Sequence, residues 1–217
     1  INDFVAQASA IRGLDAADIR GLHPGTAHPD RPRVVLGPGT GLGVAFLLHG
    51  GATAPVLSSE AGHSSFAPQD ALQTELLHRL RAEFGHVSRE RLLSGPGLLR
   101  IANALGEIEG APLNLATPPE VSERAARGCA TSRRAVGVFC SVLGATAGDM
   151  ALTLLAEGGV FVTGGLCRNL GDLLDVEALT EGFRAKGRFA GYLEDVPISQ
   201  VMRPHTGLLG AAVYHPG

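Results

Sequence analysis

The stretch RVVLGPGTGLGVAFLLHGG (33–51) constrains the fold more than any other part of this sequence. Two apolar runs flank a glycine-rich centre, which predicts a β-hairpin with strands over 33–37 and 42–49. A dinucleotide-binding fingerprint would open a helix after the glycines, and a P-loop would continue as Gly-Lys-Ser/Thr. Neither pattern follows here. The Gly-Thr-Gly turn could cradle phosphate oxygens with backbone N–H groups and the Thr40 hydroxyl, or it could be a hairpin turn without a ligand.

The rest of the chain is expected to alternate helices and strands, which indicates an α/β fold. Residues 14–32 are rich in Asp, Gly, His and Pro and are expected to form a loop. Apolar spacing predicts helices over 1–13 and 68–85, and further helices are expected over 88–93, 97–106 and 207–215. Residues 132–156 are apolar nearly all round, which predicts a helix in the interior. Short apolar runs predict further strands over 54–60, 158–165 and 196–201. Two polar signals mark helix ends: SGPG (94–97) breaks one helix, and TPPE (117–120) starts another as a capping box.

Composition excludes several classes of protein. The 217 residues suffice for one large domain or two small ones. The net charge is −3 and the sequence has no basic stripe, which argues against nucleic acid as the main partner. Apolar stretches are interrupted before the roughly 20 residues that a membrane span needs, and because no charged n-region and apolar h-region open the sequence, we expect no signal peptide. The widely spaced Cys129, Cys140 and Cys167 fit neither a disulfide framework nor a zinc site. We therefore expect a cytoplasmic protein with three reduced thiols.

A second glycine motif, TGGLCRN (163–169), follows a predicted buried strand and precedes a helical run. Its glycines would let a ligand lie against the backbone at the carboxyl end of a strand, although a simple strand-to-helix turn explains them as well. With this motif added, the chain resembles bacterial glucokinases of the hexokinase type. The matching stretches, in family order, are INDF, GPGTGLGVAFLLH, SEAGHSSFAP, AEFGHVSRERLLSGPGL, GGVFVTGG, GFRAKGRF and GLLGAAV.

The resemblance implies a fold and a function. The fold is the large α/β domain of an actin-like (ribonuclease H-like) ATPase, with a mixed sheet and flanking helices. The function is transfer of the γ-phosphoryl group of ATP to the 6-hydroxyl of D-glucose. A related group of kinases and repressors carries a Cys-rich zinc motif after the histidine, but here the next cysteine after His63 is Cys129.

The resemblance also assigns the polar residues. Asp3 is the expected catalytic base, and Asn2, Glu60, His63 and Glu90 are expected to bind the sugar hydroxyls. From the residues alone, Asn2-Asp3 would be a helix N-cap, and Glu90 would compensate a helix dipole. His63 would be a hydrogen-bonded loop histidine, since Glu60-x-x-His63 lacks a third metal ligand.

The nucleotide is assigned in the same way. Gly39, Thr40 and Gly41 are expected to meet the phosphates of ATP, and Gly164 and Gly165 the adenosine. Mg²⁺ is implied by ATP chemistry, bound through phosphates and water rather than by a protein cage. Family habit implies a homodimer.

The expected organisation has three parts. Residues 1–14 form a hinge and the end of a small lobe that carries the catalytic pair, 15–204 form the large domain, and 205–217 form a helix returning toward the small lobe. No Asp-Gly-Gly-Thr-like first phosphate loop occurs in the sequence. Two alternatives therefore stay open: a non-catalytic sugar-binding module, and a kinase for another hexose or another phosphoryl donor. Ser59 and Ala61, where relatives are expected to carry glycines, leave the sugar preference open.

Overall fold

The computed structural model describes residues 1–49 and 55–214. Within these residues, one mixed sheet of six strands has the order β1-β6-β5-β2-β3-β4. The strands are β1 (Ile19–His23), β2 (Arg33–Pro38), β3 (Leu42–Leu47), β4 (Val56–Ser59), β5 (Val160–Val162) and β6 (Ile198–Val201). Strand β5 is parallel to both β2 and β6, while the other neighbouring pairs are antiparallel. The parallel centre is reached through helical crossovers.

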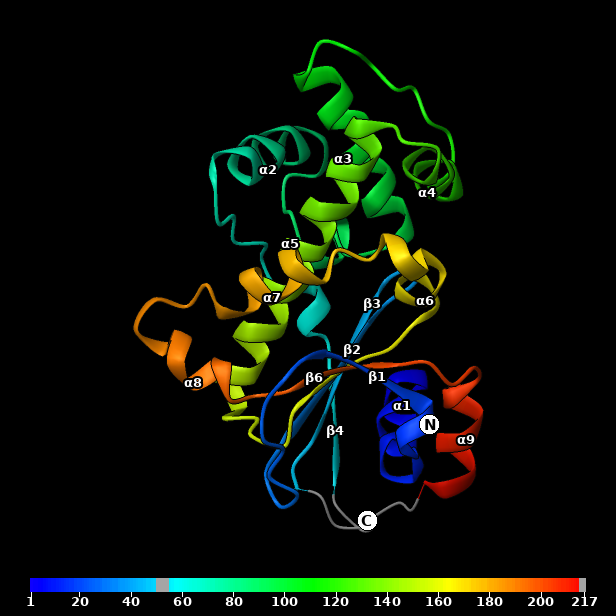
Figure 1. Cartoon of the computed structure of the whole chain (residues 1–217), viewed down its shortest axis with the longest axis vertical. Helices are drawn as coiled ribbons and strands as arrows, with labels where there is room; N and C mark the ends of the chain where they lie inside the picture. Colours follow the sequence, from blue (N-terminus) through cyan, green and yellow to red (C-terminus); the bar gives the residue numbers. More distant parts are fainter. Residues whose placement is uncertain (50–54, 215–217) are drawn as a thin grey trace.

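Helices cover both faces of the sheet and extend beyond one end of it (Figure 1). They are α1 (Asp3–Ala10), α2 (Ala71–Phe84), α3 (Gly95–Ile108), α4 (Pro118–Ala126), α5 (Ala130–Leu154), α6 (Gly165–Leu170), α7 (Val176–Arg184), α8 (Ala190–Glu194) and α9 (Thr206–Val213). Two short 3₁₀ helices, η3 (Ala61–His63) and η4 (Arg89–Arg91), lie between the sheet and the helical end. The fold thus has a helix–sheet–helix arrangement with an added helical region.

The alternation of side chains along the strands sorts the core into two layers. Val34 and Leu36 of β2 belong to the large cluster that includes α5 and α7, whereas Val35 belongs to a smaller cluster with Phe4 and Ile11 at the N-terminal end of the chain. Helix α9 packs beside α1, at the red and blue ends of the chain in Figure 1. Helix α1 is therefore fixed on the opposite face of the sheet from α5.

Helix α5 is the central core helix, as its nearly continuous apolar sequence predicts. In the described part of the chain it alone is long and apolar enough to span a membrane, which differs from the expectation that no apolar stretch reaches that length, but 72% of its most apolar window is buried by the rest of the protein. Gly144 and Gly148 let it approach α7 closely, because a Cβ at Gly148 would lie 2.5 Å from the carbonyl oxygen of Phe183. This surface of α5 is therefore used for internal packing.

The hairpin prediction is confirmed, and β2 pairs with β3 from Arg33–Leu47 to Pro38–Leu42. The predicted loop over 14–32 is wrong in part, because it contains β1, which pairs antiparallel with β6. Strand β1 lies at the sheet edge and carries the sequence IRGLH, with Arg20 and Gly21 exposed. A polar edge strand of this kind has no apolar alternation, so the sequence pattern does not reveal it.

Two predicted helix starts also need correction. The segment SGPG begins α3 rather than separating two helices: Ser94 caps it by accepting a hydrogen bond from the N–H of Gly97 (3.1 Å). At α4 the Thr117 hydroxyl donates to the Glu120 carboxylate (2.7 Å) instead of accepting from the backbone, so no capping box forms. The predicted 88–93 helix is only the 3₁₀ turn η4. Predicted elements at 54 and 215 extend outside the described residues.

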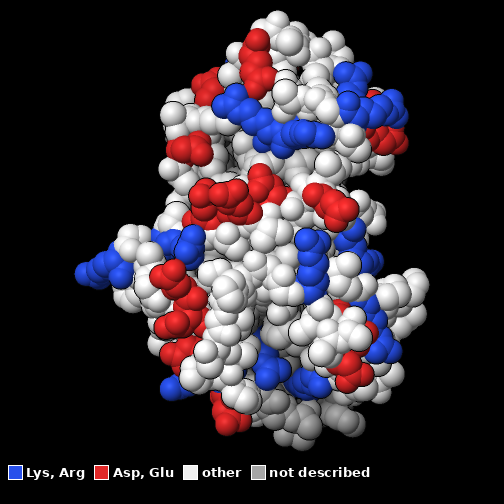
Figure 2. All heavy atoms as spheres, viewed as in Figure 1, with Lys and Arg blue, Asp and Glu red and all other residues white. Residues whose placement is uncertain are grey.

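The charge on the surface agrees with the balanced composition. On the face seen in Figure 2, basic side chains form a row across the upper, helical part above a group of acidic side chains, and both signs are interspersed over the rest of the face.

Candidate active site

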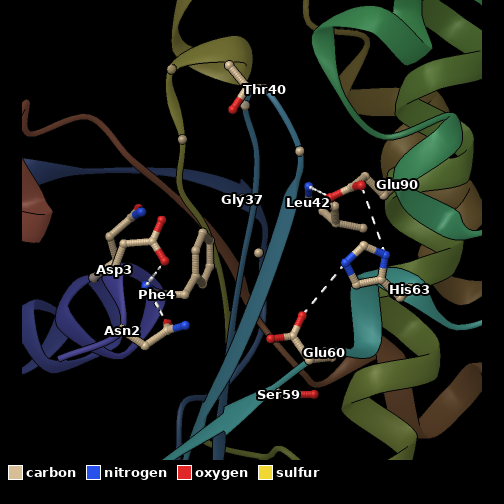
Figure 3. Close-up of a pocket in the computed structure, with 16 residues that line it drawn as sticks. Asn2, Asp3, Phe4, Gly37, Thr40, Leu42, Ser59, Glu60, His63 and Glu90 are labelled. Carbon is tan, nitrogen blue, oxygen red and sulfur yellow. Dashed lines mark hydrogen bonds and ion pairs between the residues drawn. The ribbon is translucent and has the colours of Figure 1, made fainter.

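The ten residues predicted for the site line one cavity of about 420 Å³. It lies between the start of α1, the β2–β3 turn, η3 and η4 (Figure 3). The predicted residues are Asn2, Asp3, Gly39, Thr40, Gly41, Glu60, His63, Glu90, Gly164 and Gly165. Five separate segments of the sequence thus meet around one space, although no pattern in the chain alone brings them together.

Asn2 and Asp3 form one wall and also begin helix α1. The Asn2 Oδ1 atom accepts hydrogen bonds from the N–H groups of Phe4 (2.8 Å) and Val5 (3.2 Å), so Asn2 is the N-cap. Asp3 Oδ1 accepts a hydrogen bond from the Phe4 N–H (2.8 Å). The pair therefore caps helix α1, as the N-cap interpretation expects, and also lines the cavity. The cap orients the Asn2 side chain, and its amide nitrogen remains a donor for a ligand.

Glu60, His63 and Glu90 form the opposite wall (Figure 3). His63 Nε2 lies 3.7 Å from Glu60 Oε2, and His63 Nδ1 lies 4.0 Å from Glu90 Oε1. The Glu60 side chain is 82% exposed and that of Glu90 only 32%. His63 thus lies between two carboxylates, that of Glu60, which is mostly exposed, and that of Glu90, which is mostly buried.

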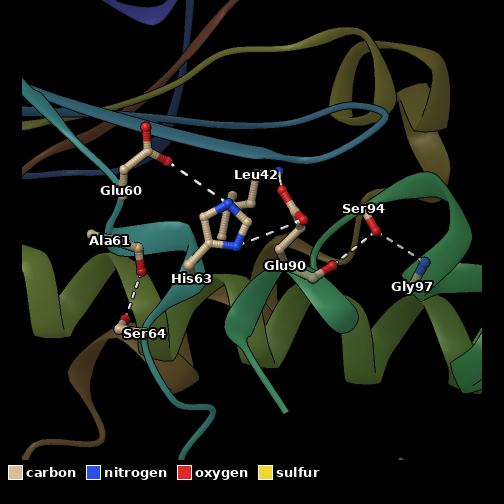
Figure 4. Close-up of polar contacts among 8 residues, drawn as sticks. All are labelled: Leu42, Glu60, Ala61, His63, Ser64, Glu90, Ser94 and Gly97. Carbon is tan, nitrogen blue, oxygen red and sulfur yellow. Dashed lines mark hydrogen bonds and ion pairs between the residues drawn. The ribbon is translucent and has the colours of Figure 1, made fainter. Parts of the chain in front are cut away.

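Glu90 is the most firmly held of the three. Its Oε2 atom accepts a hydrogen bond from the Leu42 N–H (2.9 Å), which ties η4 to the start of β3. Its backbone carbonyl accepts a hydrogen bond from the Ser94 hydroxyl (2.9 Å), and Ser94 also caps α3 (Figure 4). Oε1 remains directed toward His63, where a ligand hydroxyl could reach it.

The β2–β3 turn closes the cavity next to Glu90. The Gly39 N–H donates to the Gly41 carbonyl (2.8 Å), and the Gly39 carbonyl accepts from the Gly95 N–H (2.8 Å) at the start of α3. No hydrogen bond among the described residues engages the Thr40 hydroxyl. A side chain at Gly41 would collide with the Glu90 carboxylate. The turn therefore combines a free hydroxyl with backbone that a ligand can approach closely.

Gly164 explains why the second glycine motif has its sequence. Its φ of +92° favours glycine, and a Cβ there would lie 2.5 Å from the Pro38 carbonyl oxygen. The end of β5 can therefore pass directly beside the end of β2.

Sequence reasoning missed five residues of the cavity, which are Phe4, Gln7, Gly37, Leu42 and Gly43. The Phe4 ring lies against Gly37 and Gly43, which face each other across the hairpin, and a Cβ at Gly43 would overlap this ring. Gln7 accepts a hydrogen bond from the Thr163 hydroxyl (2.9 Å), so it joins α1 to the end of β5. Two glycines that pair with each other on neighbouring strands were the sequence signal for a bulky side chain that lies across the hairpin.

A second, largely apolar cavity of about 560 Å³ adjoins the first. The two share Gly39, Thr40 and Gly165. Its other walls come from the starts of α3 and α4 and from α6, with lining residues that include Pro96, Leu98, Pro118, Leu166 and Leu170. The glycine turns thus separate a polar compartment from an apolar one.

The two compartments define the chemistry that the site can support. Carboxylates, an amide and an imidazole suit a ligand with several hydroxyls, because each can pair with one hydroxyl. The adjoining apolar space suits a flat ring. Among the described residues, no three His, Cys, Asp or Glu side chains converge to hold a metal ion.

Comparison with known proteins gives consistent matches. A glucokinase family model matches residues 1–216. The glucokinase of Caulobacter vibrioides (strain NA1000 / CB15N) is 42% identical over 215 residues, which cover 98% of this chain and 65% of that protein. The chain thus spans about 65% of the length of this curated relative.

Solved structures show the same fold. A glucokinase from an Antarctic psychrotroph has a TM-score of 0.91 at 36% identity, covering 98% of this chain and 66% of the other. A ROK family glucokinase from Streptomyces griseus, solved in complex with glucose and AMPPNP, has a TM-score of 0.64 at 20% identity, covering 97% of this chain and 65% of the other. At that identity the second match shows a shared fold alone.

Proposed function

Because the chain belongs to the glucokinase family, we propose that the protein transfers the γ-phosphoryl group of ATP to the 6-hydroxyl of D-glucose. The fold class predicted from the sequence is confirmed: the chain has the mixed sheet and flanking helices of a sugar kinase with the actin-like ATPase fold. One observation carries the proposal on activity. A carboxylate, a cluster of sugar-type ligands and a glycine turn with a free hydroxyl line the same cavity.

Asp3 is the proposed catalytic base. Phosphoryl transfer to an alcohol needs a carboxylate within hydrogen-bond reach of the attacking hydroxyl, which loses its proton as the new O–P bond forms. Asp3 is the carboxylate at the start of α1, next to the N-cap, and it faces the cavity across from Glu60, His63 and Glu90. In this arrangement the sugar lies between the two walls, with its 6-hydroxyl toward α1.

The remaining polar residues are proposed to hold the sugar. The Asn2 amide nitrogen would donate to a ring hydroxyl beside the base. Glu60, His63 and Glu90 would bind hydroxyls near the anomeric carbon. An analogue that lacks one of these hydroxyls would leave a carboxylate or imidazole unpaired, which is a strong source of discrimination.

The nucleotide is proposed to span both compartments. Its phosphates would meet Gly39, Thr40 and Gly41. Its adenosine would lie against Gly164 and Gly165 and extend into the apolar cavity next to α4 and α6. The protein donors at this point are N–H groups and a hydroxyl rather than a carboxylate cage, so Mg²⁺ would arrive with the nucleotide, held by phosphates and water.

We also propose the domain roles that the resemblance implies. Residues 1–14 would form the hinge to a small lobe, 15–204 the large domain, and the helix within 205–217 the return toward that lobe. The close packing of α1 with α9, where a Cβ at Gly210 would collide with the Ala6 carbonyl, would let the two helices move as one unit. A cytoplasmic homodimer is the proposed working form, which light scattering on the purified full-length protein would test.

A kinase for another hexose is the second candidate. Ser59 lines the cavity beside Glu60, and its hydroxyl accepts a hydrogen bond from the Ala61 N–H (3.0 Å). A serine here narrows the cavity edge relative to glycine. Comparing kcat/KM for glucose, mannose, fructose and N-acetylglucosamine would decide between the two candidates.

The base assignment is tested by Asp3→Ala in the full-length protein. We expect turnover in a coupled assay with Mg-ATP to fall at least about 100-fold, the usual contribution of a general base. Calorimetry should still detect glucose binding. Asp15→Ala, an exposed carboxylate outside the cavity, is the matched control. Turnover of Asp3→Ala within tenfold of the unchanged protein would show that Asp3 is not the base. Glucose binding without any turnover in the unchanged protein would favour a non-catalytic sugar-binding module.

A further inference from the structure

The segment GFRAKGRF (182–189) is not used by the proposed function, although it contains the only lysine of the sequence, Lys186. Lys186 follows α7 and precedes the 3₁₀ turn at Gly187–Phe189. Its side chain is only 10% exposed, which is unusual for lysine, a residue that is seldom buried unless it is paired. Its partner is Asp149 of α5, at 2.7 Å between Nζ and Oδ1.

Asp149 binds a second cation with its other oxygen. Arg89 Nη2 lies 2.9 Å from Asp149 Oδ2, and the Arg89 side chain is 12% exposed. One carboxylate therefore pairs with two cations that are both largely buried, one cation on each of its oxygens, and the three side chains keep a net charge of +1. Without this carboxylate, the two cations would be left close together with no other acidic partner among the described residues.

The packing of α5 against α7 makes this arrangement possible. A Cβ at Gly148 would lie 2.9 Å from Lys186 Cε, so the glycine beside Asp149 provides the space for the lysine stem. A larger residue at 148 would push away the group that Asp149 binds. The Lys186–Asp149 pair is thus built into the helix interface rather than being a surface contact.

Arg89 connects this cluster to the active site. It is the first residue of η4, and the next residue is Glu90. The backbone of η4 is held from the other side, where the Arg89 N–H donates to the Ser64 carbonyl (3.0 Å), one residue beyond His63. The side chain of Arg89 reaches α5 while that of Glu90 reaches the cavity. The cluster therefore holds η4 between the core and the sugar ligands.

We propose that Asp149, braced by Lys186, is a positioning residue for Glu90. It fixes η4 through Arg89, so that Glu90 keeps Oε2 on the Leu42 N–H and presents Oε1 beside His63. This inference rests on the proposed function, in which Glu90 binds the sugar. Small displacements of a positioned ligand cost affinity, and Glu90 binds the sugar throughout the reaction, so the effect belongs in sugar affinity more than in the chemical step.

The test is Asp149→Asn, which keeps the shape of the side chain and removes its charge. We expect the Kd for glucose, measured by calorimetry, to rise about tenfold, with a matching rise in KM for glucose and little change in KM for ATP. Asp175→Ala is the control for a purely structural effect. It removes the N-cap of α7, on the same helix pair, without touching η4. It should lower the melting temperature and leave the Kd for glucose within twofold.

Three outcomes separate the ideas. If Glu90→Gln does not weaken glucose binding, the proposed sugar role of Glu90 fails and the positioning role fails with it. If Glu90→Gln weakens binding but Asp149→Asn stays within twofold of the unchanged protein, only the positioning role is overturned. Should Asp149→Asn fail to fold, Arg89→Lys replaces it, because the shorter ammonium loses the tie to Asp149 but keeps the charge. Unchanged glucose affinity in that variant would equally overturn the proposal.

Discussion

At the scale of single residues, the glycines of GPGTGLG have different tasks. Gly37 and Gly43 make room for the Phe4 ring, whereas Gly41 makes room for the Glu90 carboxylate. A Cβ at Gly39 would meet nothing within 4 Å. One short motif therefore fixes helix α1, which carries the proposed base, on one side and Glu90, a proposed sugar ligand, on the other.

This difference gives a matched pair of substitutions in one turn. Gly41→Ala should displace Glu90 from the Leu42 N–H and raise the Kd for glucose about tenfold, since a positioned carboxylate is lost. Gly39→Ala should leave that Kd unchanged when nucleotide is absent. Calorimetry with glucose alone measures both. Equal Kd values for the two variants would mean that the contact with Glu90 does not govern sugar binding.

At the scale of elements, the sequence predicted the hairpin and the helices around the site, and it missed the strand and the side chains whose positions depend on contacts between distant segments. The hairpin has two apolar runs around a glycine-rich centre and helix α5 has a long, nearly continuous apolar sequence, so the positions of both could be predicted. Strand β1 exists because β6 offers an unpaired edge, which no local pattern encodes. The roles of Phe4 and Gln7 likewise depend on contacts between α1 and distant strands.

Helix α1 joins the stability of an element to the site, because Asn2 is both its N-cap and a cavity residue. Asn2→Ala should lower the free energy of unfolding by about 1 kcal/mol through loss of the cap and should also weaken glucose binding. Asn2→Ser keeps a capping oxygen but has no amide, so its stability should stay near that of the unchanged chain. Its glucose affinity should fall as far as that of Asn2→Ala. Thermal unfolding and calorimetry separate the two effects. Full glucose affinity in Asn2→Ser would remove the amide from the list of sugar ligands.

At the scale of the whole molecule, the core contains two thiols that can report on global stability. Burial raises the pKa of Cys140 to about 12 and raises that of Cys167 further. Cys129 at the start of α5 is different, since the neighbouring polar groups, first of all the Ser132 side chain, lower its pKa. The three cysteines, all expected to be reduced thiols packed in the core, thus fall into two classes, because Cys140 and Cys167 are buried and Cys129 is partly exposed.

The two buried thiols make stability depend on alkaline pH. In the unfolded chain they ionise near a pKa of about 8.5, whereas in the folded protein they stay protonated to much higher pH. Their contribution is complete below about pH 8.5 and is lost as the pH rises toward the folded-state pKa, because only the unfolded chain releases the protons. The free energy of unfolding should therefore fall with a slope that approaches about 1.4 kcal/mol per pH unit for each thiol. Urea unfolding at about pH 8.5, 9 and 9.5 measures this slope.

Cys140→Ala should reduce the slope by about half, because one of the two titrations is removed. Cys129→Ala should not reduce it, because a thiol with a lowered folded-state pKa does not contribute a loss of stability in this range. A slope that is unaffected by Cys140→Ala would mean that water reaches this thiol in the folded protein.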